Sequence, residues 1–174
     1  MPLSLHAALI PGWLQILTST RALVDKTEAH CTATGIDPQT LIGARLIDDM
    51  LPFAYQIKSC AVHSQGAIEG VRKGQFAPDM ADPPHSFAGL AERLDAASLF
   101  LAGVDPAELD DLAGRDMMFE IPGRIRYDFT GADFLLGFSQ PNFFFHATTA
   151  YNILRANGVR IGKRDYIGAM PLKG

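Results

Sequence analysis

Hydrophobic residues recur every three or four positions along four long stretches of the chain. This spacing places them on one face of a helix, so the sequence predicts long helices over about residues 3–29, 46–73, 87–103 and 131–157. Prolines interrupt three of these stretches, and each predicts a kink or a restart: Pro11, Pro52 and Pro141. Four long helices joined by loops are typical of a four-helix bundle.

Residues that favour helix ends mark several boundaries of this pattern. Asp37 precedes Pro38, Ser86 precedes the third long stretch and Thr130 precedes the last. The side-chain oxygens of Asp, Ser and Thr accept hydrogen bonds from the free amides of a first helical turn, and proline is tolerated in that turn. We therefore expect a short helix from Pro38 and capped starts for the last two long helices. Gly158 is expected to end the last one.

The period of the pattern changes to two between Met117 and Phe129. Apolar and polar side chains alternate there on both sides of a Pro-Gly pair, which predicts a short β-hairpin. Residues 74–85 contain three prolines and are predicted to be a loop. The predicted fold class is therefore all-α, a four-helix bundle with a small β-hairpin insertion near 117–129, in a single domain of residues 1–174.

Composition narrows the classes of partner. Hydrophobic residues make up 48% and charged residues 20% of the 174 residues, which suits one soluble domain. The formal net charge of −4 argues against a nucleic-acid partner, because neutralising phosphates needs a basic face. Five basic residues near the C-terminus face a single acid, Asp165. A solvated tail, a subunit contact or an anion site would each explain them.

The two cysteines, Cys31 and Cys60, form neither a disulfide framework nor a C-x-x-C metal pair. Free buried thiols in a reducing cytoplasm are the simplest interpretation. The first residues lack the pattern of an export signal, and no apolar run reaches the length of about 18 residues that a membrane span needs. We expect a cytoplasmic protein with no membrane partner.

Polar residues on two of the predicted helices suggest a shared site. In the last helix, Asn142 and His146 stand one turn apart in an otherwise apolar segment. In the second, Asp49, Gln56 and His63 follow one another along a single face. If these faces meet, the side chains form a polar cluster inside the bundle, which is how bundle proteins build metal and ligand sites.

Each of these residues also has a local explanation. His146 would be a neutral buried histidine bonded to Gln56 or to a carbonyl, and Asn142 would bond a carbonyl left free by Pro141. Asp49 would be a helix N-cap and His63 a half-exposed surface residue. Outside this group, Tyr151 would tether its helix through its hydroxyl group.

Several blocks of the chain together resemble the DUF1993 family of bacterial proteins: 49–57, 141–146, 149–151, 153–155, Gly158 and 161–166. The resemblance covers nearly the whole chain. That family has no characterised function and is similar to the DinB/YfiT-like superfamily, whose members are four-helix bundles and often homodimers. The resemblance therefore implies the same bundle and a second copy of this chain as a partner.

Better-known members of that superfamily bind zinc or nickel with three histidines, one on the second helix and two spaced H-x-x-x-H on the last. Here His146 matches the final histidine, and Asn142 replaces the one before it. The resemblance implies one of two states: a divalent metal held by His146 with His63 or Asp49, or no metal. We favour the second, because a carboxamide is a poor zinc or nickel ligand.

Three functions follow from these observations. The first is a bundle whose eroded metal site has become a polar pocket for a small molecule, lined by Gln56, Asn142, His146, Asp49 and Tyr151. The second is a metal-dependent transferase or hydrolase with a nonstandard ligand set. The third is a dimeric interaction protein. Catalytic residues cannot be assigned from this sequence, because it contains no phosphate-binding loop, nucleophile elbow or H-E-x-x-H motif.

Overall fold

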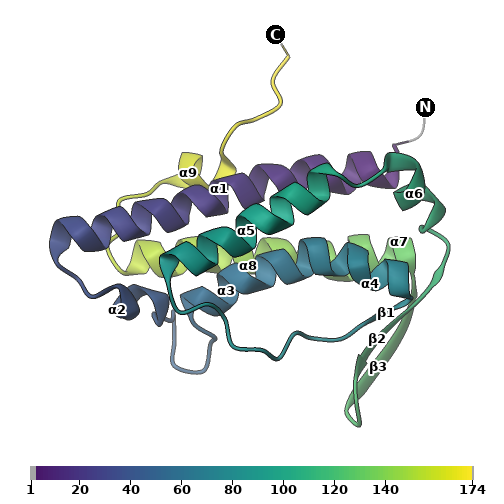
Figure 1. The fold of residues 1–174 in the computed structure, drawn as a ribbon, viewed down its shortest axis with the longest axis horizontal. Helices are drawn as coiled ribbons and strands as arrows, with labels where there is room; N and C mark the ends of the chain where they lie inside the picture. The colour runs from purple at the N-terminus through teal and green to yellow at the C-terminus, as the bar shows by residue number, and fades with distance from the viewer. Residues whose placement is uncertain (1–2, 174) are drawn as a thin grey trace.

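The computed structural model describes residues 3–173, and the fold is mostly helical with a small three-stranded sheet at one end (Figure 1). The long helical segments are α1 (Leu5–Thr34), α5 (Phe87–Ala102), α3 to α4 (Phe53–Ala61, then η1 Val62–Gly66, then Ala67–Lys73) and α7 to α8 (Gly131–Asp133, then η2 Phe134–Ser139, then Gln140–Ala156). Short helices complete the chain: α2 (Pro38–Ile42), α6 (Pro106–Asp111) and α9 (Lys163–Ile167).

The long segments lie side by side, with α1 against α5 and α3 against α8 (Figure 1). Each turns its apolar face inward, so one core runs the length of the molecule. Trp13 of α1 and Phe143 of α8 are fully buried and meet in the middle of that core, with ring centroids 6.0 Å apart. Pro11 is exposed, and α1 continues through it.

Three helix starts lie where the sequence predicts them. Asp37 caps α2, Ser86 caps α5 and Thr130 caps α7, each through a side-chain oxygen that accepts a backbone amide hydrogen. The predicted hairpin is also present. Strand β2 (Asp116–Ile121) pairs antiparallel with β3 (Ile125–Thr130).

The second long helix is shorter than predicted. It begins at Phe53, and residues 46–51 form a mostly exposed turn instead of a first helical turn. Pro52 is the reason, because it stands at the N-cap in extended backbone conformation, while the amide of Phe53 bonds the carbonyl of Ala44 at 2.8 Å. Asp49 is therefore not the N-cap of this helix.

The predicted loop at 74–85 is also partly wrong, because Gln75–Phe76 form a strand, β1, parallel to β2. Neighbouring residues in the sequence do not predict a strand of two residues whose partner lies far along the chain, at Met118 and Phe119. The rest of the connection to α5 is irregular and is fixed to α3 by Lys58, which is 3% exposed. Its Nζ donates to the carbonyls of Asp79, at 2.8 Å, and Ala81, and forms an ion pair with the Asp79 carboxylate at 3.1 Å.

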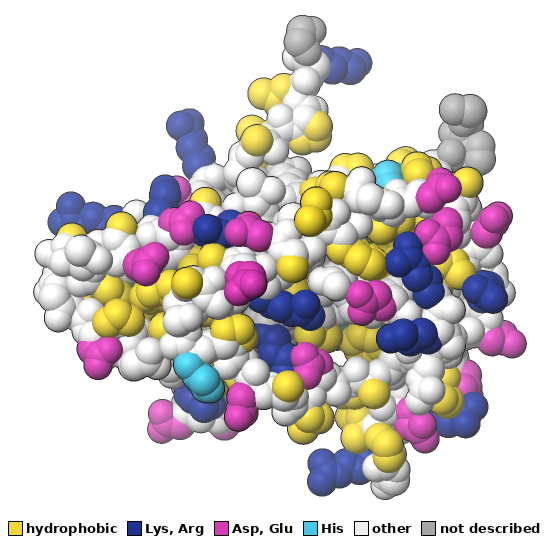
Figure 2. Space-filling model, in the orientation of Figure 1, with side chains coloured by type: hydrophobic (Ala, Val, Ile, Leu, Met, Phe, Trp, Pro, Cys, Tyr) yellow, Lys and Arg dark blue, Asp and Glu magenta, His cyan; other side chains and the backbone are white. Residues whose placement is uncertain are grey.

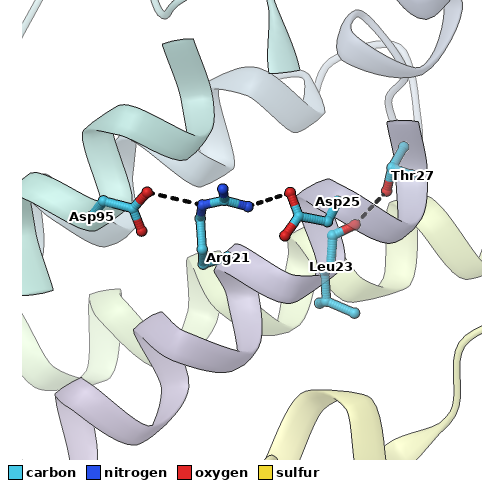
Figure 3. Close-up of polar contacts among 5 residues, drawn as sticks. All are labelled: Arg21, Leu23, Asp25, Thr27 and Asp95. Atoms are coloured by element: carbon cyan, nitrogen blue, oxygen red, sulfur yellow. Dashed lines mark hydrogen bonds and ion pairs between the residues drawn. The ribbon is translucent and has the colours of Figure 1, made fainter. Parts of the chain in front are cut away.

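Charged groups are otherwise mostly on the surface. Figure 2 shows basic and acidic side chains interspersed over one face of the molecule. At the rim of the α1–α5 contact, Arg21 lies between Asp25 of its own helix and Asp95 of α5, with 3.1 Å to the latter (Figure 3). Within the described residues, no helix combines the length and the apolar character required to cross a membrane.

Candidate functional site

Two π-helical turns interrupt the helices that carry the candidate residues. One, η1, contains His63, and the other, η2, ends at Ser139. A π turn holds one extra residue and is frequent at functional sites. Proline at position 141 favours this irregularity, because its ring cannot donate an amide hydrogen and clashes with the carbonyl one turn earlier in a regular helix. The two wide turns bring His63 and Ser139 together, with 3.3 Å between Nδ1 and Oγ.

The second histidine, His146, is held from α3. Its Nδ1 lies 2.7 Å from Oε1 of Gln56, which is 2% exposed. Gln56 in turn donates from Nε2 to the carbonyl of Leu51, at 2.8 Å. The predicted meeting of the two helices at Gln56 and His146 is therefore present.

The two imidazole rings lie next to each other among aromatic side chains. Their centroids are 5.5 Å apart and their planes differ by 17°. Phe76 and Phe138 contact the His63 ring, with centroids at 5.7 and 5.9 Å. Tyr55 contacts the His146 ring at 6.0 Å, edge-on.

Both histidines are neutral at pH 7. Burial lowers the pKa of His63 to about 3, and the neighbouring His146 lowers it further. Burial alone lowers the pKa of His146 to about 4. The cause is the loss of water around a charged ring. The site therefore offers two uncharged imidazoles, each of which can donate or accept a hydrogen bond.

The second nitrogen of each ring is in contact with solvent. In residues 3–173, the buried side-chain nitrogen and oxygen atoms without a hydrogen-bond partner are Trp13 Nε1 and Thr20 Oγ1. The Nε2 atoms of His63 and His146 have no partner among the described hydrogen bonds, which use Nδ1 in both rings. Since neither Nε2 atom belongs to the buried unpartnered set, each keeps some exposed surface.

The remaining candidates lie differently. Asn142 donates from its side-chain amide to the carbonyl of Phe138 at 2.7 Å, which is the local role predicted beside Pro141. Asp49 is exposed in the turn before α3 and is not on the helix face where it was expected. Tyr151 packs edge-on against Tyr166 of α9, with centroids 6.0 Å apart.

Cys60 lies one turn before His63 but is not an activated nucleophile. It is fully buried, and its Sγ donates to the carbonyl of Gln56 at 3.3 Å. Burial raises the pKa of this thiol far above its ordinary value, so the reactive thiolate is not formed near neutral pH.

The donor set does not fit a zinc or nickel site. Such sites use three or more histidine, cysteine or carboxylate ligands. In the part of the chain that the structure describes, no three of these side chains come together in a way that could hold a metal ion. His63 and His146 are two such ligands. The side chains that hydrogen-bond to them, Ser139 to His63 and Gln56 to His146, belong to neither of these ligand types.

Ser139 is the residue that the sequence did not reveal. It is fully buried and lies at the end of η2, two positions before the proline. From the sequence, a serine at this position is expected to be exposed or to cap a helix. The π turn that directs it toward His63 has no clear sequence signal. The aromatic neighbours Tyr55 and Phe138 were likewise not among the predicted site residues.

The site is separate from the cavity along α1. That cavity has a volume of about 830 Å³ and lies between α1 and the C-terminal segment, with Gln15, Ser19 and Met170 among its lining residues. Gln15 fixes the segment there by donating to the carbonyl of Ile167 at 2.8 Å.

The helical fold is similar to that of a solved protein of the DinB family. A crystal structure of a DinB family member from Shewanella denitrificans superposes with a TM-score of 0.82 and 29% identity, over 98% of this chain and 95% of that one. The sequence profile of DUF1993, a domain of unknown function, matches residues 5–167. The chain belongs to the DUF1993 family. No curated protein matches its sequence.

Proposed function

We propose that this protein is a four-helix bundle of the DinB type that binds a small uncharged molecule at the His63–His146 site. The four helices of this bundle are the long segments α1, α3 to α4, α5 and α7 to α8. The observation that carries the proposal is the pair of neutral imidazoles whose free Nε2 atoms reach solvent.

The surroundings support a ligand that is uncharged and partly apolar. Aromatic rings flank both imidazoles: Tyr55, Phe76, Phe138 and Phe145. The described hydrogen bonds of the two rings are to an amide and a hydroxyl, not to a carboxylate. A charged ligand would lose water on entering without gaining an opposite charge, which is unfavourable.

The test is a titration of isotope-labelled protein, treated with a chelator, with phenol, benzamide and indole, followed through the imidazole NMR signals. We expect saturable shifts at His63 and His146. The exposed His85 is the internal control and is expected to stay unchanged. The same shifts should be lost in His146→Ala.

A parallel titration with zinc and nickel addresses the alternative of a metal-dependent enzyme. We expect no one-to-one complex at micromolar metal. Stoichiometric binding that His146→Ala abolishes would overturn the proposal in favour of the metal site, and the absence of any fragment-induced shift would overturn it outright.

A further inference from the structure

The hydrogen bonds of Gln56 determine which nitrogen of His146 carries the proton. The amide nitrogen of Gln56 is used by the carbonyl of Leu51, at 2.8 Å, so its oxygen faces His146. An amide oxygen can accept but not donate. Nδ1 of His146 must therefore carry the hydrogen, and its Nε2 presents a lone pair to solvent.

The hydroxyl of Ser139 determines the opposite form for His63. Ser139 is fully buried, and within residues 3–173 the described hydrogen bonds give its Oγ one partner, Nδ1 of His63. If His63 donated this bond, the hydroxyl hydrogen would be buried with no acceptor, which is unfavourable. The hydroxyl therefore donates to Nδ1, and Nε2 of His63 carries the hydrogen.

We infer that the two histidines form a matched pair, with His63 Nε2 as a hydrogen-bond donor and His146 Nε2 as an acceptor, for the hydroxyl group of an aromatic ligand. The two rings lie 5.5 Å apart and nearly parallel, and a hydroxyl group is the simplest group that can accept from one ring and donate to the other. Gln56 and Ser139 act as positioning residues: Gln56 fixes the tautomer of His146, and Ser139 fixes that of His63. The inference rests on the proposed function and names the ligand group that the site selects.

Other polar groups satisfy this pair less well. A carboxylate has no hydrogen to give His146, and an ammonium group has no lone pair to accept from His63. An ether accepts but does not donate. The aromatic rings around the pair favour a flat apolar body on the ligand, because rings of this kind pack edge-on or offset against one another.

The first measurement needs no ligand. Nitrogen and carbon chemical shifts of the imidazoles distinguish the two neutral forms. In the free protein at pH 7, we expect the Nδ1–H form at His146 and the Nε2–H form at His63. The opposite form at either ring would overturn the inference and would leave the proposed small-molecule site standing.

The second measurement compares phenol with anisole and benzoate. Phenol and anisole share the aromatic ring, but the methyl group of anisole replaces the hydrogen that His146 would accept. We expect phenol to bind about 3- to 10-fold more tightly than anisole, the value of one net hydrogen bond. Benzoate is expected to give no shift at the two rings.

Variants of the positioning residues separate their role from simple stability. Gln56→Leu removes the acceptor at Nδ1 of His146, so this ring should show a mixture of forms, and the preference for phenol should fall to about 1-fold. Gln56→Glu keeps an acceptor there and should retain the Nδ1–H form. Ser139→Ala should give a mixture of the two neutral tautomers at His63 and leave the tautomer of His146 unchanged.

The outcomes are distinguishable. Equal binding of phenol and anisole, with shifts at His63 and His146, would refute the donor–acceptor pair but keep a ligand site. Shifts from none of the aromatic probes would refute the proposed function itself. A phenol preference that survives in Gln56→Leu with unchanged histidine forms would show that Gln56 does not position His146.

Discussion

Helices α1 and α5 pack in one way, and the segments around α3 and α8 in another. Between α1 and α5 both helices are regular, and the charged groups stay at the rim, where Arg21 lies between Asp25 and Asp95 (Figure 3). Where α3 and α8 meet, each of the two helical segments contains a π turn, and the polar groups that meet are uncharged and largely buried.

The irregular helix geometry is confined to the contact that buries polar side chains. Exposed ion pairs contribute little to stability and place few demands on helix geometry. A buried imidazole needs a partner in a set direction, and the two π turns supply it at the cost of regular hydrogen bonding. Departures of this kind are expected at functional sites, while the rest of a fold remains consistent.

The largest expected effect concerns the core that both regions share. Phe143→Ala removes a fully buried ring that contacts Trp13 of α1, and we expect a loss of about 3–5 kcal/mol in the free energy of unfolding. Phe145→Ala, two positions later, is the matched control, because this ring is 56% exposed. Urea unfolding measures both, and equal losses would contradict the described packing of α8.

The second effect is a pH dependence confined to the α3–α8 region. The pKa of His146 is about 4 in the folded protein and 6.5 in the unfolded chain, so from pH 6.5 down to 4 the unfolded chain binds the proton and the folded protein does not. Stability therefore falls with pH in that window, by about 3 kcal/mol for this residue. His63, with a pKa of about 3, adds a loss of similar size in the same window and extends it to lower pH.

Urea unfolding at several pH values between 7 and 4 checks this pH dependence. His146→Gln should remove about half of the loss, because His63 keeps its own lowered pKa. His85→Ala, at an exposed position, should follow the wild-type curve. A wild-type stability that stays constant from pH 7 to 4 would show that the two imidazoles are not kept neutral by the fold.

The third effect tests how the irregular helix begins. A Cβ atom at Gly131 would lie 2.2 Å from the carbonyl oxygen of Leu112, so Gly131→Ala must displace backbone, and we expect a loss of about 1–3 kcal/mol. At Gly137, within η2, a Cβ would meet nothing within 4 Å. Gly137→Ala is therefore expected to be neutral or slightly stabilising. Thermal unfolding of the pair measures the contrast, and a neutral Gly131→Ala would contradict the close approach.

The smallest effect belongs to the α1–α5 rim. Arg21→Ala removes both of its ion pairs, but these groups are largely in water, and we expect a loss of about 0.2–1 kcal/mol. The difference from wild type should shrink further in 1 M salt, because ions screen exposed charges. A loss above 2 kcal/mol, unaffected by salt, would mean that this rim resembles the α3–α8 contact more than described.

The sequence predicted best what depends on neighbouring residues. The caps at Asp37, Ser86 and Thr130 and the alternation of the hairpin are local signals, and all were confirmed. A bond between His146 and Gln56 was one of the alternatives that the sequence left open, provided that the two helix faces meet, and it is present.

The errors arose where the deciding contact is distant or the helical period changes. The apolar residues of 46–51 suggested a helix, but Pro52 is the N-cap and the helix begins at Phe53. Strand β1 exists through pairing with β2, far along the chain. The late start of α3 also leaves Asp49 outside that helix. The π turns change the helical period, so the contact of His63 with Ser139 could not be predicted from spacing.

The tether from Lys58 to residues 79–81 also controls where the chain can be cut. A protease needs several residues in extended form, free of other contacts, and here the backbone carbonyls on both sides of residue 80 are bound by a buried ammonium group. Proteolysis between α4 and α5 should therefore wait until this connection separates from α3. The rate of that cut then reports the separation of this connection from α3, the helix that carries Gln56.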